Sequence, residues 1–172
     1  MQKSHYGYNY IKFTIPTQGI NGREVKHIFK TVQTKIDQPQ VVFICLGNSC
    51  RSIMAEALAR HLFGERLAAA SAGISPLGLV AQETLQVLQE LGVDTGGLRS
   101  KGLEEIDIQE CRLLVNLTHH SLGALIPAGG LGKLLNRAMP DPYGGSLERY
   151  RRTRDAIHRF LVDELGPALR WA

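Results

Sequence analysis

Short apolar runs alternate with amphipathic segments along most of this 172-residue chain. The apolar run at residues 41–44 predicts a buried strand, and the segment 54–60 shortly after it predicts a helix. Similar patterns predict strands over residues 67–73, 112–117 and 133–135, helices over 80–91 and 119–126, and a closing helix capped by Ser146. Strands and helices that alternate in this way form a parallel sheet covered on both faces. We therefore expect an α/β domain whose ligands bind at the carboxyl ends of the strands.

The loop between the first of these strands and its helix carries the densest chemistry. It reads Cys-Leu-Gly-Asn-Ser-Cys-Arg-Ser from Cys45 to Ser52. At the start of a helix, backbone N–H groups lack intrahelical partners and the helix dipole adds partial positive charge, so the loop is suited to binding an anion. Cys45 at its rim should ionise easily, and Arg51 adds a cation that matches two phosphate oxygens. The loop therefore combines a nucleophile with an anion clamp.

The spacing Cys-x5-Arg-Ser resembles the phosphate loop of the low-molecular-weight protein tyrosine phosphatases. This family also includes bacterial protein-arginine phosphatases and thioredoxin-linked arsenate reductases. A bare Cys-x5-Arg arises by chance in front of ordinary helices, but here Asn48, Ser49 and Ser52 also match, and the loop lies between a strand and a helix. The resemblance covers residues 40–172 and implies a flavodoxin-like, three-layer α/β fold with a four-stranded parallel sheet.

A second segment, Asp-Pro-Tyr-Gly-Gly-Ser at residues 141–146, lies in a Pro- and Gly-rich loop before the closing helix. Its composition alone would also suit a plain β-turn. The family carries its general acid in an Asp-Pro-(Tyr/Phe) loop. The resemblance therefore implies that Asp141 protonates the leaving group and later activates water, and we expect Tyr143 to form a wall of the pocket mouth.

The resemblance also implies the remaining site residues. Cys45, Arg51 and Asp141 would be catalytic. The support residues would be Asn48, Ser52 and Ser71, with Ser52 also stabilising the thiolate. Leu98 departs from the family, because relatives often have a hydrogen-bonding His at this position. The phosphate would be bound by the loop residues Leu46, Gly47, Asn48, Ser49, Cys50 and Arg51.

The expected function is hydrolysis of phosphotyrosine through a phosphocysteine intermediate. Phosphoarginine is the alternative substrate, because Ser49 stands where tyrosine phosphatases have a bulky aliphatic residue and arginine phosphatases have Thr. Arsenate reduction is less expected, since the chain has no cysteine at residues 116–121, where reductases keep a resolving pair. Cys111 is predicted to be a small buried hydrophobe. Binding without cleavage is also less expected, because the nucleophile, the arginine and the acid are all present.

The role of Cys50 stays open between two readings. In relatives, the second cysteine of the loop can form a protective disulfide with the oxidised nucleophile. A packed loop residue is the equally acceptable alternative.

Composition adds weaker constraints. A hydrophobic content of 44% with 21% charged residues is ordinary for a globular domain, and three cysteines that include a nucleophile suit the reducing cytoplasm. The net charge is +4, and the arginines at residues 149–154 are predicted to form a solvated helix face. We expect phosphorylated proteins or peptides as partners, and no nucleic acid or membrane. The histidines show no metal-ligand spacing, so no metal or other cofactor is expected. The oligomeric state stays open.

Residues 1–39 lie outside the resemblance and are predicted to be an N-terminal extension before the phosphatase domain at residues 40–172. Residues 10–15 alternate like a strand, and residues 18–22 predict a turn. Residues 25–36 suit either an amphipathic helix or a second strand. The role of the extension stays open between covering a sheet edge, contacting a partner and remaining disordered.

Overall fold

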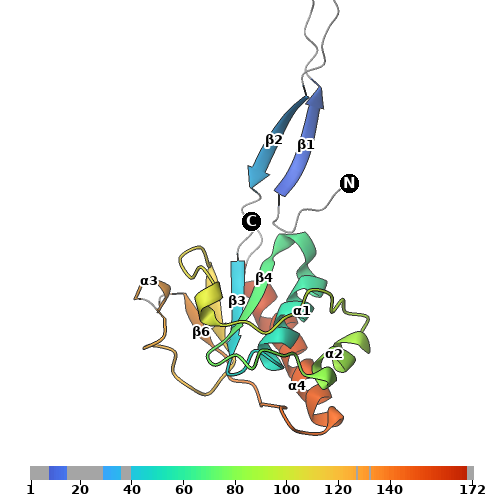
Figure 1. Ribbon diagram of the computed structural model, residues 1–172, viewed down its shortest axis with the longest axis vertical. Coiled ribbons are helices and arrows are strands. Elements are labelled where there is room, and N and C mark those ends of the chain that lie inside the picture. The colour runs from blue at the N-terminus through green and yellow to red at the C-terminus, as the bar shows by residue number, and fades with distance from the viewer. Residues whose placement is uncertain (1–7, 15–28, 36–39, 127, 132, 170–172) are drawn as a thin grey trace, which may run out of the picture. The chain divides into compact units, whose positions relative to one another are not determined.

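The computed structural model describes residues 8–14, 29–35, 40–126, 128–131 and 133–169 (Figure 1). The chain divides into two units, Met1–Asp37 and Gln38–Ala172. In the first unit, strand β1 (Tyr8–Thr14) pairs antiparallel with β2 (Phe29–Lys35). The strand expected near residues 10–15 is confirmed over Tyr8–Thr14, and residues 29–35 form a strand rather than a helix. The predicted turn at residues 18–22 lies outside the described residues.

The second unit contains a four-stranded, all-parallel sheet in the order β4-β3-β5-β6. Because all strands run in one direction, their carboxyl ends meet at one edge, and Cys45 at the end of β3 lies beside Gly73 at the end of β4. This confirms the expected fold class. The fourth strand begins one residue later than predicted. The strands are β3 (Gln40–Cys45), β4 (Ala68–Gly73), β5 (Leu113–Asn116) and β6 (Leu134–Asn136).

Three longer helices and several short ones connect and follow the strands. Helix α1 packs against β3, β4, α2 and α4, so the phosphate loop at its start is held by the core of the unit. The helix predicted over residues 80–91 is observed over Gln82–Gln89, and Gly92, which has a φ of 68°, lies in the turn that follows it. The elements are α1 (Arg51–Phe63), η1 (Gly64–Arg66), α2 (Gln82–Gln89), η2 (Leu103–Glu105), α3 (Ala128–Leu131), α4 (Leu147–Phe160), the π-helical turn η3 (Leu161–Leu165) and α5 (Gly166–Ala168).

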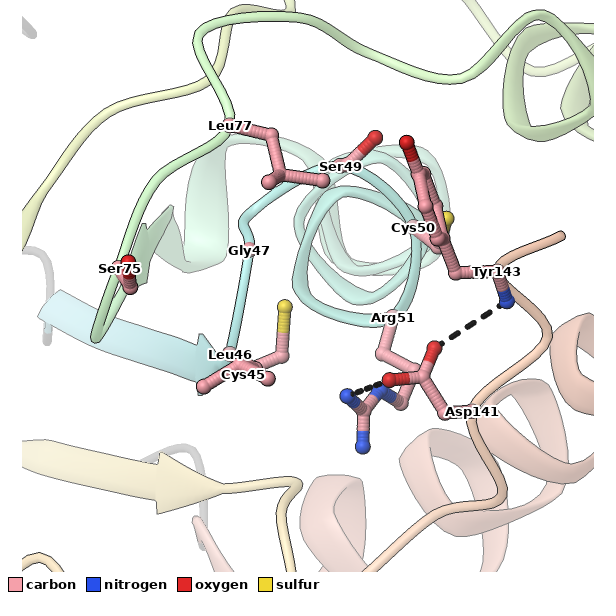
Figure 2. Close-up of a pocket in the computed structure, with 10 residues that line it drawn as sticks. All are labelled: Cys45, Leu46, Gly47, Ser49, Cys50, Arg51, Ser75, Leu77, Asp141 and Tyr143. Atoms are coloured by element: carbon pink, nitrogen blue, oxygen red, sulfur yellow. Dashed lines mark hydrogen bonds and ion pairs between the residues drawn. The ribbon is translucent and has the colours of Figure 1, made fainter.

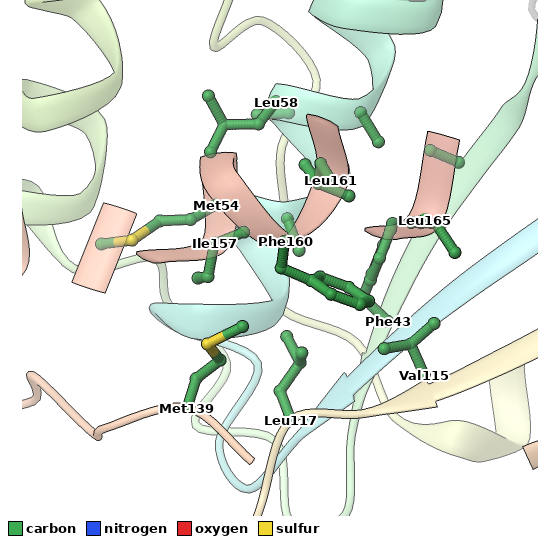
Figure 3. Packing of buried hydrophobic residues seen from close by; sticks show 14 of the residues in the cluster. Phe43, Met54, Leu58, Val115, Leu117, Met139, Ile157, Phe160, Leu161 and Leu165 are labelled. Atoms are coloured by element: carbon green, nitrogen blue, oxygen red, sulfur yellow. The ribbon is translucent and has the colours of Figure 1, made fainter. Parts of the chain in front are cut away.

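The core explains the continuous apolar run of β3. Phe43 points to one face of the sheet and packs with Val115 and with residues of α1 and α4, such as Met54 and Phe160 (Figure 3). The alternate residues of β3 point to the other face. There Val42 and Ile44 belong to a cluster with residues of β4, of β5 and of the segments before and after β5: Ala72, Leu114, Cys111, Leu122 and Ile126. Both faces are covered, so no position of the strand needs to be polar.

The helix predicted over residues 119–126 is wrong, because the segment forms turns instead. Asn116 at the end of β5 explains the difference. Its side-chain oxygen accepts hydrogen bonds from the N–H of Thr118 (2.9 Å) and from the Thr118 hydroxyl (2.8 Å), while its nitrogen donates to the carbonyl of His120 (2.8 Å). A helix would need that carbonyl for its own ladder. The asparagine therefore offers the backbone a competing set of partners.

Candidate active site

The loop between β3 and α1 turns its carbonyl groups outward. The carbonyls of Cys45, Leu46, Gly47 and Ser49 accept hydrogen bonds of 2.9–3.2 Å from backbone N–H groups of the segment 74–81. Asn48, which has a φ of 43°, lets the loop curl in this way, since Asn tolerates the left-handed region better than most residues. With the carbonyls engaged outside, the amides are left to face the enclosed space. Such an array of backbone N–H groups forms an anion-binding concavity.

Cys45 lines this concavity, and the residue is 2% exposed. Its Sγ is 3.0 Å from Oγ of Ser52 in the first turn of α1. Nδ2 of Asn48 donates to the same Ser52 oxygen at 2.7 Å, so the hydroxyl hydrogen is left to point at sulfur. A hydroxyl donor and a helix N-terminus both stabilise a thiolate.

Arg51 and Asp141 meet at the side of the concavity. Nη2 of Arg51 forms an ion pair with Oδ2 of Asp141, and Nη1 donates to the carbonyls of Leu117 and Met139, both at 3.4 Å. Nε of Arg51 is buried without a hydrogen-bond partner, and so is Oγ of Ser49. Buried polar atoms in this state are rare. Two of them at one loop indicate that a polar ligand completes the site.

These residues surround a cavity of about 280 Å³ (Figure 2). Its mouth is apolar, because Leu46, Leu77 and Tyr143 are 43%, 47% and 55% exposed. In Figure 2, Asp141 pairs with Arg51 and accepts a hydrogen bond from the N–H of Tyr143 (3.2 Å), whose ring extends toward Ser49. The cavity is lined by Cys45, Leu46, Gly47, Ser49, Cys50, Arg51, Ser75, Leu77, Asp141 and Tyr143.

Sequence reasoning missed Ser75 and Leu77 as pocket residues. Gly47 carried a signal for Leu77, because a Cβ at position 47 would lie 2.9 Å from Cγ of Leu77. A glycine inside the loop therefore marks the close approach of another segment.

The three expected support residues do meet behind the loop. Nδ2 of Asn48 donates to Oγ of Ser71 at 2.9 Å as well as to Ser52. The backbone N–H of Lys101 donates to Oδ1 of Asn48 at 2.7 Å, so the amide has a donor although Leu98 cannot supply one. Sequence reasoning also did not identify Glu56 as a buried partner of Ser71. A single charge in the apolar stretch of α1 was the available signal for it, since charged residues are seldom buried without a partner.

The other two cysteines differ from Cys45 in their surroundings. Sγ of Cys50 donates to Oη of Tyr150 at 3.6 Å, and burial raises the pKa of its thiol. Burial raises the pKa of Cys111 to about 11. Cys111 packs with Val42, on the opposite face of the sheet from Cys45, and its burial confirms the prediction.

Among the described residues, no group of three or more His, Cys, Asp or Glu side chains could hold a metal ion. In the same part of the chain, none of the helices combines the length and the apolar character that crossing a membrane requires.

Comparison with known proteins agrees with the geometry of the site. The chain is 32% identical over 124 residues to arsenate reductase 2 of Staphylococcus saprophyticus, which covers 71% of this chain and 92% of that protein. It is 29% identical over 139 residues to the protein-arginine-phosphatase of Bacillus subtilis, with 70% and 91% covered. The crystal structure of a low molecular weight protein tyrosine phosphatase from T. tengcongensis matches 76% of this chain and 99% of that one, with 29% identity and a TM-score of 0.67. The sequence profile described as low molecular weight phosphotyrosine protein phosphatase matches residues 40–165. The chain belongs to the low molecular weight phosphotyrosine protein phosphatase family.

Proposed function

We propose that this protein hydrolyses phosphotyrosine in proteins or peptides through a phosphocysteine intermediate. Membership of the family supports a cysteine-based phosphatase. The observation that carries the proposal is the position of Cys45, whose Sγ is 3.0 Å from the hydroxyl of Ser52 and lines one cavity together with Arg51 and Asp141. A nucleophile, an anion clamp and an acid are thereby present in a single site.

In the first step, the Cys45 thiolate attacks phosphorus, so that an S–P bond forms as the P–O bond to the phenol breaks. Loop amides and the Arg51 guanidinium hold the three equatorial oxygens and stabilise their charge. Asp141 gives its proton to the departing phenolic oxygen. In the second step, the Asp141 carboxylate takes a proton from water, the water oxygen attacks phosphorus, and the S–P bond breaks. Inorganic phosphate leaves, and the thiolate and the protonated acid are restored.

The apolar mouth of the cavity favours phosphotyrosine. The side chains of Leu46, Leu77 and Tyr143 are all at least two-fifths exposed there. A phenyl ring that enters between them removes apolar surface from water, which is favourable by about 25 cal/mol per Å². An aromatic partner such as Tyr143 adds ring–ring contact.

Phosphoarginine is a second candidate, favoured by Ser49. Its hydroxyl lines the cavity and is buried without a hydrogen-bond partner. A guanidinium group brings N–H donors that need an acceptor, whereas a phenyl ring would leave the hydroxyl unsatisfied. The similarity to the protein-arginine-phosphatase of Bacillus subtilis supports this alternative.

The positions of the thiols do not favour arsenate reduction. That chemistry needs a second cysteine to take over the oxidised sulfur. Cys111 is on the opposite face of the sheet from Cys45, and the thiol of Cys50 is engaged with Tyr150. The phosphatase reaction consumes no reductant. It does require a reduced Cys45, so the proposal places the enzyme in a reducing compartment such as the cytoplasm.

Phosphate release from two matched peptides, one with phosphotyrosine and one with phosphoarginine, tests the proposal. The Cys45→Ser variant serves as the blank. We expect the wild-type protein to have the higher kcat/KM on the phosphotyrosine peptide. A preference for phosphoarginine would make Ser49 the selector, and Ser49→Ile should then shift the preference toward phosphotyrosine. Release from neither peptide would contradict the proposal, and arsenate-dependent oxidation of a thiol reductant would then be assayed.

A further inference from the structure

Glu56 is a buried carboxylate that is not among the residues lining the substrate cavity. Its side chain on α1 is 1% exposed. A buried charge is costly unless it is paired and hydrogen-bonded. Oε1 pairs with the guanidinium of Arg60, whose side chain is 48% exposed, and Oε2 pairs with Nζ of Lys101 at 3.1 Å. The Lys101 side chain is only 11% exposed, so its pair with Glu56 is the shielded half of this arrangement.

A chain of hydrogen bonds connects Glu56 with the nucleophile. The Ser71 hydroxyl donates to Oε2 of Glu56, so its oxygen is free to accept a hydrogen from Nδ2 of Asn48 at 2.9 Å. The second hydrogen of that nitrogen goes to Oγ of Ser52 at 2.7 Å, which leaves the Ser52 hydrogen for Sγ of Cys45 at 3.0 Å. An ionised carboxylate can only accept hydrogen bonds. Its charge therefore commits the Ser71 hydrogen to Glu56 and leaves the Ser71 oxygen to hold Nδ2 of Asn48, which can only donate to the two serines.

Lys101 also contacts two other members of this chain, Asn48 and Ser71. Its backbone N–H donates to Oδ1 of Asn48 at 2.7 Å. Its carbonyl, outside the chain, accepts from the N–H of Gly73 at 2.9 Å. The first bond fixes which side of the Asn48 amide carries the oxygen, and therefore directs Nδ2 toward the two serines. Nζ also lies 3.4 Å from Oγ of Ser71. The ammonium thus lies beside the one hydroxyl through which Glu56 reaches Asn48.

We propose that Lys101 is a positioning residue for the nucleophile. Its ammonium compensates the buried charge of Glu56, and the ionised Glu56 in turn keeps the Ser71, Asn48 and Ser52 hydrogen bonds directed toward the Cys45 thiolate. Without the ammonium, Glu56 takes up a proton or water enters, and the Ser71 hydroxyl can turn. A Ser71 hydrogen turned toward Nδ2 of Asn48 faces another donor, so the amide that holds Ser52 shifts and the Ser52 hydrogen is less well aligned with sulfur. The kinetic part of this inference rests on the proposed phosphatase function.

The test compares Lys101→Met, which removes the charge at similar length, with Lys101→Arg, which keeps it. Arg99→Met is the matched control, because Arg99 is two residues away and pairs with Glu105 on the surface. We expect Lys101→Met to lower kcat for the peptide substrate roughly tenfold to a hundredfold, since small misplacements of reacting groups cost that much. KM should change little, because the substrate-facing groups are untouched. Lys101→Arg should restore most of the rate.

A second readout does not depend on any substrate. Alkylation of Cys45 by iodoacetate, located by tandem mass spectrometry and followed against pH, reports the thiolate directly. Lys101→Met should need a higher pH than the wild type or Arg99→Met to reach half of its maximal rate. If the wild type releases no phosphate, the proposed function fails while this measurement still decides the role of Lys101.

The proposal is overturned if Lys101→Met matches Arg99→Met in both kcat and alkylation profile. It is equally overturned if Lys101→Met lowers only the melting temperature. Should Lys101→Met fail to fold, Lys101→Gln provides an uncharged side chain that can still hydrogen-bond to Glu56, and the same two readouts apply to it.

Discussion

The phosphate loop and the acid loop bring complementary groups to one cavity, but they are built in opposite ways. In the phosphate loop, residues 48–52 are all buried, and Asn48 and Ser52 are completely inaccessible. In the acid loop, Asp141 and Tyr143 are exposed, and few bonds hold the segment. Apart from the ion pair with Arg51, its bonds include one of 3.2 Å from the N–H of Tyr143 to Oδ1 of Asp141 and one of 2.8 Å from the N–H of Gly145 to the Pro142 carbonyl. The Thr153 hydroxyl also donates to the carbonyl of Pro140 at 3.3 Å.

The difference corresponds to what each loop must do in the proposed reaction. Groups that stabilise developing charge work best when they are already in place, because reorganising them costs free energy during the reaction. An acid that serves first the leaving group and then a water molecule benefits from freedom to adjust. The rigid loop is therefore the electrostatic part of the site, and the exposed loop is its adaptable part.

The largest effect should come from the rigid loop. Cys45→Ser replaces the thiolate with a hydroxyl that is hardly ionised at neutral pH, so we expect phosphate release to fall below detection. Phosphate binding should persist, because the loop amides and Arg51 are unchanged. Steady-state release and calorimetric titration with phosphate measure the two properties. Cys111→Ser, on the other face of the sheet, is the control and should keep its activity. A Cys45→Ser protein that turns over at nearly the wild-type rate would falsify the assignment of the nucleophile.

The acid loop should give the next largest effect. Asp141→Ala should lower kcat roughly 10²- to 10⁴-fold on a phosphotyrosine peptide, which is the usual contribution of a general acid. The loss should shrink with aryl phosphates whose leaving groups are more acidic, since these need less protonation. A loss that is independent of the leaving group would argue that Asp141 does not act as the acid.

The ion pair between Arg51 and Asp141 joins the two loops and gives a test that involves both of them. The Asp141 carboxylate pairs with the Arg51 guanidinium, which phosphate also needs. Asp141→Asn removes this competing charge, so inorganic phosphate should inhibit the residual activity of the variant several-fold more strongly than it inhibits the wild type. Weaker inhibition would mean that Asp141 contributes to binding phosphate rather than opposing it.

The rigid loop was also the part that could be predicted from the sequence. Its chemistry lies within eight consecutive residues, and the strand before it is apolar from Val41 to Ile44 because both of its faces are covered. Asp141, which lines the same cavity, was expected there through the family resemblance, since an Asp-Pro start alone would also suit a plain β-turn.

Long-range contacts set the limit of such prediction. Leu77 reaches the pocket mouth only because the segment after β4 donates to the carbonyls of the phosphate loop. The buried pair of Glu56 and Lys101 joins residues 45 positions apart, and no local pattern reports such a pairing. Residues 119–126 show the opposite error. Their local pattern predicts a helix, but the hydrogen bonds made by Asn116 favour turns instead. Ser146 is a smaller error of prediction. It lies at the N-cap of α4 as predicted, but its side chain makes no capping hydrogen bond.

Two glycine substitutions, one at each loop, should lower stability by similar amounts, so they allow the rigidity of the two loops to be compared through activity. A Cβ on Gly73 would lie 2.9 Å from the Leu46 carbonyl oxygen and 3.0 Å from the Asn48 nitrogen, so Gly73→Ala must push the phosphate loop. Gly144 in the acid loop has a φ of 70° with open space around it, so Gly144→Ala adds only backbone strain. Each should cost about 1–3 kcal/mol of unfolding free energy.

Activity should separate the two glycine variants. We expect Gly73→Ala to lower kcat/KM about tenfold or more, because it displaces groups that must be in place before the reaction. Gly144→Ala should stay within about threefold of the wild type. Melting curves and kinetics measure the two effects. Equal losses of activity would mean that the acid loop is as rigid as the phosphate loop, and the contrast between them would not hold.

The smallest effect should come from the rim of the cavity. Tyr143 is 55% exposed and touches substrate only through its ring in the proposed reaction. Tyr143→Ala should therefore raise KM for a phosphotyrosine peptide about twofold to tenfold, which corresponds to the 0.5–1.5 kcal/mol of an aromatic pair. The value of kcat should be unchanged, because the ring contributes equally to substrate and transition state. Tyr143→Phe keeps the ring and should behave like the wild type. If Tyr143→Ala instead lowers kcat at constant KM, the ring orients Asp141 rather than the substrate, and the acid loop is more ordered during catalysis than its exposure indicates.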